Sequence, residues 1–345
     1  MRPNKEGNSE IYRISVGKET HQMQTNDKSI LDLMKDISAG KIQLPDFQRG
    51  WVWDDSRICG LIASITQNFP VGAAMFLEYG NNNVHFKYRI IEGAPRSDAK
   101  PDFLILDGQQ RLTSIYSSLC SSRAVKTKTD KGTPITRFYY IDIPKAVDPS
   151  VDRMDAIISV PENKQMTSDF GRKIDLDVST VEKEYENKLF PLNIILDSVK
   201  ATQWQIGYMQ YYQVDQAVCQ EYLTFMSEII QTVSHYQIPV ITLDKETPKE
   251  AVCQVFENVN QGGVSLTVFE LVTAVFAMDD FELRPDWENR KYNHLNGEVL
   301  NIVTATDFLT ACTLLAAYDK GGTVSCKKKD VLNLQLADYQ KYADL

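Results

Sequence analysis

The segment 107-DGQQR-111 places a carboxylate, two amides and a guanidinium next to one another in the sequence. Apolar residues recur at helical spacing from Leu112 onward, which predicts that a helix begins near Gln109. The first turn of a helix presents unpaired N–H groups and the positive end of the helix dipole, so it favours an anion and disfavours a cation such as Arg111. A bound phosphate would remove this conflict, because the helix N–H groups, the glutamine amides and the guanidinium can all donate to it.

Two interpretations of this segment stay open. In the first, Arg111 and the helix N-terminus hold a phosphate. In the second, Asp107 caps the helix and forms a local ion pair with Arg111, so the strand, turn and helix make a corner that needs no ligand. The two interpretations compete, because a capping carboxylate accepts from the same N–H groups that a phosphate would use.

A second glutamine–arginine pair, Gln48 and Arg49, lies in 45-PDFQRGWVWDD-55, just before another predicted helix. Two guanidinium groups facing one pocket suit a polyphosphate, since each can form two parallel hydrogen bonds to phosphate oxygens. The alternative is a surface contact in which Arg49 stacks on Trp51 or Trp53.

A third polar cluster, 256-FENVNQGG-263, places Asn258 and Asn260 at the end of a predicted helix, with Gly262 after them. Ordinary helix capping explains these residues if the cluster is taken alone. The cluster indicates a functional site only when it is considered together with the other two clusters.

Strands and helices are mixed through the first two thirds of the sequence, and helices dominate the last third. This order predicts an α+β protein, with a core domain over 1–245 and a helical region over 246–345. A charged insertion with a short helix is expected around 161–188, and TVFE (267–270) fits the capping-box pattern of a helix start. The strands expected include 11–16, 73–79, 84–91, 103–106, 137–143, 155–160 and 238–243, and the helices expected include 29–38, 54–67 and 214–234.

The charge balance of the sequence is acidic. It has 37 basic and 46 acidic residues, for a net charge of −9, which argues against a protein that coats nucleic acid through bulk charge. Local DNA contact stays open. The basic segment 122–134, expected to be a loop with Arg123, Lys126, Lys128 and Lys131, favours such contact, although a solvated surface loop is the simpler interpretation.

The six cysteines show no C-x-x-C pair and no zinc-finger spacing, which predicts reduced thiols rather than a disulfide framework. The N-terminal residues are polar and lack the apolar run of a signal peptide, and no stretch is apolar and long enough to cross a bilayer. These features predict a cytoplasmic protein with no membrane partner. P-loop, dinucleotide, zincin and α/β-hydrolase motifs are absent from the sequence.

In this order and spacing, the three clusters resemble the N-terminal domain of GmrSD-type modification-dependent restriction systems, which also occurs in SspE-like phosphorothioate-sensing defence proteins. The resemblance rests on 44-LPDFQRGWVW-53, the FPVG turn at 69–72, 106-LDGQQRLTSI-115 and 256-FENVNQGGVSLTVFELVTA-274. It implies a ParB/sulfiredoxin-like mixed α/β nucleotide-binding core, followed by a mainly helical C-terminal part. It also implies that nucleotide phosphates are held at the helix after the DGQQR turn.

Carried over residue by residue, the resemblance implies a site for ATP, GTP, CTP or UTP. Arg111 and Arg49 would neutralise phosphate charge, and Gln109 and Gln110 would orient phosphate oxygens or water. Asp107 would hold Mg²⁺ or cap the helix. The positions expected to bind the nucleotide are Gln48, Arg49, Gly108, Thr113, Asn258, Asn260 and Gly262.

The resemblance further implies an NTP-hydrolysing regulatory domain of an antiphage restriction system that acts on modified phage DNA. Larger family members continue into an HNH-type nuclease domain, but the histidines at 21, 85, 235 and 294 are scattered and supply no such site in this chain. A nuclease domain or subunit is therefore expected as a partner, and homo-oligomerisation stays open. The alternative is a non-catalytic DNA-sensing or partner-binding module that uses the same pocket for a backbone phosphate.

Overall fold

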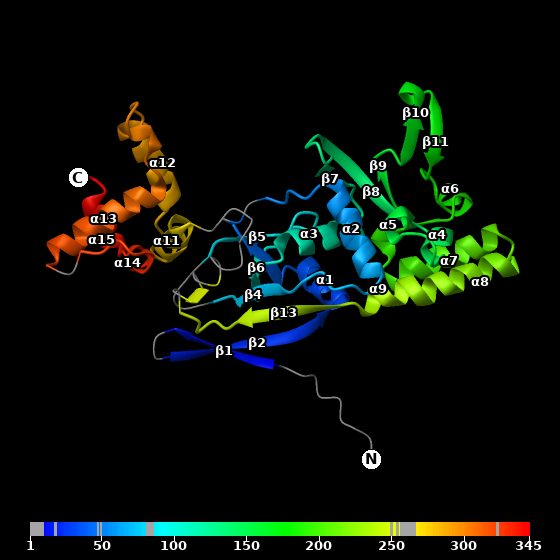
Figure 1. The fold of residues 1–345 in the computed structure, drawn as a ribbon, viewed down its shortest axis with the longest axis horizontal. Coiled ribbons are helices and arrows are strands. Elements are labelled where there is room, and N and C mark those ends of the chain that lie inside the picture. The colour runs from blue at the N-terminus through cyan, green and yellow to red at the C-terminus, as the bar shows by residue number, and fades with distance from the viewer. Residues whose placement is uncertain are drawn as a thin grey trace, which may run out of the picture.

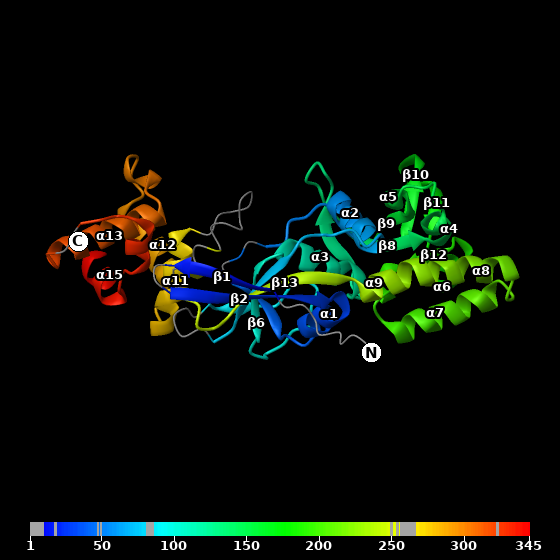
Figure 2. The same cartoon turned by 60° about the horizontal axis from the view of Figure 1, so that its bottom comes forward.

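The structure is a computed structural model of the chain. It describes residues 10–16, 19–46, 48, 50–80, 86–248, 251–252, 255, 267–321 and 324–345, with side chains from Thr25 onward except at Met278. Figure 1 shows a central sheet, a second lobe to its right that contains residues 125–225, and the C-terminal helices from residue 268 to its left. The view in Figure 2 confirms that these three parts follow one another along the long axis of the molecule.

Within the described residues, the central sheet has seven strands, which in spatial order are β1 (Glu10–Val16), β2 (Glu19–Ser29), β13 (Gln237–Leu243), β4 (Ala74–Glu78), β6 (Phe103–Asp107), β3 (Ile42–Pro45) and β5 (Tyr88–Arg89). β13 and β4 are parallel, as are β3 and β6, and the other neighbouring pairs are antiparallel. Such a mixed sheet, combined with many helices, confirms the predicted α+β class. The relation to the ParB/sulfiredoxin fold stays a prediction.

Side chains of the central strands alternate between two buried faces, as the twofold period of a strand requires. In β4, Ala74 and Phe76 pack in one hydrophobic core, whereas Met75 and Leu77 pack in the other, which includes side chains of the C-terminal helices. The strand is therefore apolar on both sides. The first core is covered by the helices that carry the candidate site, α1 (Ile30–Ser38), α2 (Asp55–Thr66) and α3 (Gln109–Leu119).

Helices α1 and α2 start where the sequence predicts. Ser29 caps α1 by accepting from the N–H of Asp32 at 3.1 Å, and Asp54 caps α2 by accepting from the N–H of Arg57 at 2.9 Å. The apolar side chains of α1 recur every three or four residues, so they lie on one face and are buried together. These caps fix the positions at which both helices meet the sheet.

Within the described residues, the second lobe contains a four-stranded sheet of β7 (Val125–Lys128), β8 (Pro134–Asp142), β9 (Ile157–Pro161) and β12 (Leu189–Pro191), in which β8 pairs with the other three. The prediction that 122–134 is a loop is wrong, because β7 pairs with β8. Val125 and Thr127 are buried and alternate with the more exposed Lys126 and Lys128, which is the pattern of a half-buried strand.

The charged segment 161–188 contains the predicted short helix, α6 (Val181–Glu186), together with an unpredicted hairpin of β10 (Gln165–Ser168) and β11 (Lys173–Asp177). Three turns of other helical type occur in the lobe and after it, η1 (Asp169–Gly171), η2 (Leu192–Ile194) and the π-helical η3 (Met226–Ile230). The remaining helices here are α4 (Ile143–Val147), α5 (Arg153–Ala156), α7 (Ser198–Tyr211), α8 (Gln216–Phe225) and α9 (Gln231–His235).

A buried carboxylate joins the helices of the lobe to its sheet. Glu184 of α6 is 4 % exposed, and it accepts hydrogen bonds from Tyr140 Oη and Trp204 Nε1, both at 3.0 Å. Lys164 Nζ lies 3.4 Å from the same carboxylate. Burial raises the pKa of Glu184, because the charged form loses its hydration, and the three donors offset only part of this effect.

This burial predicts a pH-dependent stability. Because the pKa of Glu184 is higher in the folded state, its contribution to stability is full at low pH and is lost as the pH rises above the ordinary value of 4.5. The free energy of unfolding of wild type minus that of Glu184→Gln is therefore expected to fall between pH 4.5 and 7.5. Urea denaturation over pH 3–7.5 measures this difference.

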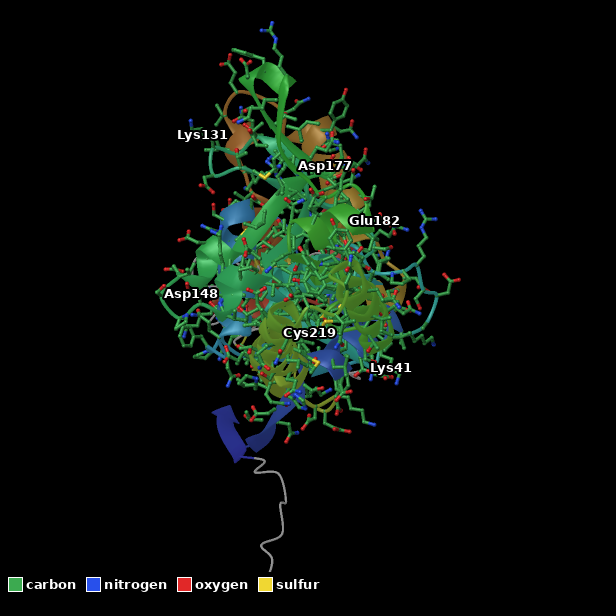
Figure 3. All side chains as sticks on the ribbon, turned by 90° about the vertical axis from the view of Figure 1, so that its right-hand side faces the viewer. Lys41, Lys131, Asp148, Asp177, Glu182 and Cys219 are labelled. Carbon is green, nitrogen blue, oxygen red and sulfur yellow. The ribbon has the colours of Figure 1, made fainter. Side chains whose placement is uncertain are left out.

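Glu182 provides the control on the same helix, with the opposite sign. Its side chain, labelled in Figure 3, is exposed, and hydrogen bonds from its own backbone N–H and from Thr180 lower its pKa. Its contribution to stability is therefore present above pH 4.5 and is lost as the pH falls. The burial argument would be refuted if the difference in the free energy of unfolding between wild type and Glu184→Gln were constant with pH. It would also be refuted if that difference changed in the direction expected for Glu182→Gln.

The C-terminal helices complete the second core. The TVFE capping box is confirmed, since the backbone N–H of Thr267 donates to Glu270 at 3.1 Å. No helix in the described part of the chain is both long enough and apolar enough to cross a membrane. The helical elements here are α11 (Val268–Phe276), η4 (Ala277–Asp279), α12 (Leu283–His294), η5 (Leu300–Ile302), α13 (Ala305–Asp319), α14 (Lys328–Leu332) and α15 (Leu336–Tyr342).

Candidate functional site

Helix α3 begins directly after strand β6, at Gln109, as the sequence predicts. Gly108 occupies the N-cap position with a φ of +89°, and a Cβ at this position would lie 3.3 Å from the Cα of Ala74. A glycine has no side chain, so the N-cap residue of α3 makes no side-chain capping hydrogen bond. The interpretation in which Asp107 caps the helix is therefore wrong, because the glycine takes the capping position and Asp107 precedes it.

Arg111 is held by three acceptors. Its Nη1 donates to the carbonyl oxygen of Val71 at 2.7 Å, and its Nη2 donates to that of Ala73 at 2.8 Å. Nη2 also lies 3.1 Å from Oδ2 of Asp107. This confirms the ion pair between Asp107 and Arg111 that the second interpretation of the segment predicted. These acceptors offset the unfavourable position of a cation near the helix N-terminus. The guanidinium thus joins α3 to the FPVG turn before β4.

The FPVG turn itself is held by a residue that the sequence analysis did not single out. Tyr236 Oη donates to the carbonyl oxygen of Phe69 at 2.6 Å and accepts from the N–H of Val71 at 3.1 Å. Gly72 in this turn has a φ of +91°, and a Cβ there would overlap with Nη1 of Arg111. The sequence signal for this contact is the glycine of FPVG, because a positive φ favours glycine.

The two glutamines nearest the arginine in sequence have different surroundings. Gln110 Oε1 accepts from the N–H of Val52 at 2.9 Å, and its Nε2 donates to the carbonyl oxygen of Gly50 at 3.3 Å. The Gln110 amide thus fixes the 50–52 loop to α3. Gln109 is 8 % exposed and is packed at the start of the helix.

Gln48 lies beside the end of β6. Its Nε2 donates to the carbonyl oxygens of Ile105 at 2.7 Å and Leu106 at 3.2 Å. Its buried Oε1 has no donor among the residues that the structure describes. Thr113 is fully buried in α3, and its Oγ1 likewise has no partner in the described part of the chain.

The structure therefore brings together most of the first two predicted clusters around the start of α3. Gln48 comes from the loop after β3, and the DGQQR residues come from the end of β6 and the first turn of α3. Four predicted site residues lie outside the described residues, namely Arg49, Asn258, Asn260 and Gly262.

The described residues contain no group of three or more histidine, cysteine, aspartate or glutamate side chains that could hold a metal ion. Asp107 is the predicted metal-binding residue, and one of its carboxylate oxygens already accepts from Arg111. A nucleotide-bound Mg²⁺ takes one or two protein carboxylates and completes its shell with phosphates and water, so a single carboxylate fits this kind of site.

Comparison with known proteins decides the family. The family model of the GmrSD restriction endonuclease N-terminal domain matches residues 30–277, a span that runs from α1 into η4 and includes the whole α3 site. This chain belongs to that family. The GmrSD resemblance predicted from the DGQQR segment and its companions is thereby confirmed.

An uncharacterized protein of Methanocaldococcus jannaschii is 28 % identical to this GmrSD-family chain over 326 residues. The match covers 91 % of this chain and 52 % of that protein, so the chain spans about half the length of the curated relative.

Proposed function

We propose that this chain binds a nucleoside triphosphate at the N-terminus of α3 and hydrolyses it, as the regulatory domain of a modification-dependent restriction system. The observation that carries the proposal is the helix start without a side-chain cap, at Gly108. A phosphate can accept from the N–H groups at such a helix start, and the helix dipole favours its charge. Membership of the GmrSD family supports the restriction role.

In this proposal, the site residues act in two groups. Arg49 and Arg111 neutralise phosphate charge, and Gln109 orients the attacking water or a phosphate oxygen. Gln110 acts as a positioning residue, because its amide is occupied by Gly50 and Val52, which follow Arg49 in the sequence. Asp107 would supply a ligand to a Mg²⁺ ion that arrives with the nucleotide, and that ion would screen the phosphate charge.

Asn258, Asn260 and Gly262 are proposed to close the site from the third cluster. DNA carrying modified bases or a modified backbone, and a nuclease domain or subunit, are the proposed partners. Nucleotide hydrolysis would then decide when the nuclease acts on DNA.

The test is phosphate release from ATP, GTP, CTP and UTP, with and without modified DNA. Arg49→Ala is expected to weaken nucleotide binding at least about tenfold, because a charge-assisted hydrogen bond to phosphate is lost. Arg57→Ala is the matched control, since the Arg57 side chain is 66 % exposed on α2 and pairs only with Asp54 among the ion pairs of the described residues.

Three outcomes are informative. Wild type that binds no nucleotide but still binds DNA would refute the proposal and favour a DNA-sensing module that grips a backbone phosphate. Nucleotide binding without cleavage under any DNA condition would make the chain a switch rather than an enzyme. Equal losses in Arg49→Ala and Arg57→Ala would place the phosphate elsewhere.

A further inference from the structure

A cleft lies between α3, near Ser117, and the β7–β8 hairpin. Its volume is about 800 Å³. Figures 1 and 2 both show the hairpin beside α3 and α2. The lining includes Trp51 and Phe138 as aromatic side chains, Glu92 and Glu162 as acids, and Arg123 and Lys126 as bases.

Glu92 gives this cleft a hydrogen-bond acceptor. Its Oε1 accepts from the N–H of Trp51 at 3.4 Å and from Arg89 Nη1 at 3.3 Å. Its Oε2 is buried and has no donor in the described part of the chain. A buried carboxylate oxygen without a donor is costly, so this one is a strong acceptor for an incoming N–H group. The last torsion of a glutamate is soft, which allows either oxygen to turn toward the cleft.

The aromatic and basic side chains add two further elements of nucleotide recognition. Trp51 is fixed in place, since its Nε1 donates to Ser114 Oγ of α3 at 3.0 Å, and Trp51 and Phe138 are partly buried. Aromatic side chains of this kind can stack on a base. Arg123 and Lys126 are exposed, and cations of this kind attract the phosphates of a nucleic-acid backbone.

We propose that this cleft binds a single unpaired nucleobase that carries an amino group, with its phosphates toward Arg123 and Lys126. Glu92 accepts from the exocyclic amino group of cytosine, adenine or guanine, and Trp51 or Phe138 stacks on the ring. Thymine fits poorly, because its one ring N–H lies between two carbonyl oxygens that repel a carboxylate. The inference rests on the proposed function in one respect: the base comes from a strand of the DNA on which the restriction system acts.

The cleft and the phosphate site lie on the same helix. Ser117 lines the cleft and Gln109 starts α3, so the two positions are eight residues apart, which is about 12 Å at the rise of an α-helix. The 50–52 loop connects them directly, since Trp51 lines the cleft while Val52 is held by Gln110. A base bound in the cleft can therefore change the position of the loop that follows Arg49.

The test is fluorescence anisotropy with labelled single-stranded 12-mers of dC, dA and dT. Wild type is expected to bind dC and dA about tenfold more tightly than dT, because one specific hydrogen-bonded contact to a base provides discrimination of this size. Glu92→Gln keeps one acceptor for the N–H of Trp51, and it is expected to reduce the dC-to-dT ratio to about twofold or less. A melting curve confirms that this variant is folded.

Lys126→Ala and Lys131→Ala form a matched pair for the phosphate contact. Both lysines lie in the β7–β8 hairpin, but only Lys126 lines the cleft, and Figure 3 places Lys131 at the edge of the molecule. Lys126→Ala is expected to weaken binding of all three oligonucleotides severalfold, with Lys131→Ala close to wild type. Trp51→Phe is expected to remove most of the change in tryptophan emission on binding.

The source of the base is decided by competition with dCMP and CTP. If either displaces the dC 12-mer at concentrations near the affinity of the oligonucleotide, the cleft takes a free nucleotide; if neither does, it takes a DNA strand. Equal binding of dC and dT by wild type, or an unchanged ratio in Glu92→Gln, would overturn the proposal. Phosphate release measured on the same proteins separates this failure from failure of the nucleotide hydrolysis proposal, since loss of hydrolysis alone leaves the base ratio intact.

Discussion

Arg111→Ala is expected to lower the free energy of unfolding by about 2–4 kcal/mol and to weaken nucleotide binding at least about tenfold. The stability loss follows from the three acceptors of the guanidinium, because the carbonyl oxygens of Val71 and Ala73 lose their charged donor and Asp107 loses its cation. The Arg111 side chain is 21 % exposed, so solvent recovers part of the loss. The binding loss follows from the proposed contact with phosphate.

The two effects of Arg111→Ala are separated by a second variant and by temperature. Arg111→Lys keeps the charge but cannot reach two carbonyl oxygens as a planar fork, so we expect it to lose stability while it keeps part of the nucleotide affinity. Affinity is measured by calorimetry at a temperature at which circular dichroism shows all variants to be folded. Arg111→Ala that is folded and binds nucleotide as wild type does would leave the arginine a structural role only.

The elements that carry the site could be predicted from local sequence. The helical spacing from Leu112 onward gave the start of α3, and the apolar run before Asp107 gave β6, because both patterns depend on neighbours within one turn or one strand. The basic segment shows the limit of composition. Its lysines suggested a loop, yet Val125–Lys128 is a strand whose burial alternates with a period of two. In 84–91, only Tyr88–Arg89 is a strand among the described residues.

The partners of Arg111 could not be predicted in the same way. Val71 and Ala73 lie about forty residues away in the chain, and the residue between them, Gly72, has a positive φ that local sequence patterns do not reveal. The Asp107 capping interpretation failed for a similar reason. A Ser, Thr, Asn or Asp cap is the common solution, but the positive φ at Gly108 selects glycine instead.

The nucleotide roles of the site residues remain predictions, because they depend on a ligand rather than on the chain. The structure shows that the polar residues of the motif have different roles, which the sequence did not indicate. Gln48 donates to β6 and Gln110 holds the 50–52 loop on α3, whereas the N-cap residue of α3, Gly108, supplies no side-chain cap. The motif therefore combines residues that build the corner with a helix end that is suited to an anion.

Gly72→Ala is expected to reproduce much of the Arg111→Ala effect without touching the arginine. A Cβ at Gly72 would overlap with Nη1 of Arg111, so the guanidinium must leave its place between the carbonyl oxygens of Val71 and Ala73. The backbone is also strained, since φ is +91°. We expect a loss of about 3 kcal/mol in the free energy of unfolding, measured with urea, together with weaker nucleotide binding.

Gly80→Ala separates the strain from the contact. Gly80 has a φ of +90°, and a Cβ there would meet nothing within 4 Å, so this variant carries the backbone cost alone, about 1 kcal/mol. The double variant Gly72→Ala/Arg111→Ala completes a cycle. Once the guanidinium is gone, Gly72→Ala should cost no more than Gly80→Ala, because only the strain remains. If Gly72→Ala costs as much in the Arg111→Ala background as in wild type, then Arg111 does not hold the FPVG turn, and the turn is positioned by Tyr236 and the backbone alone.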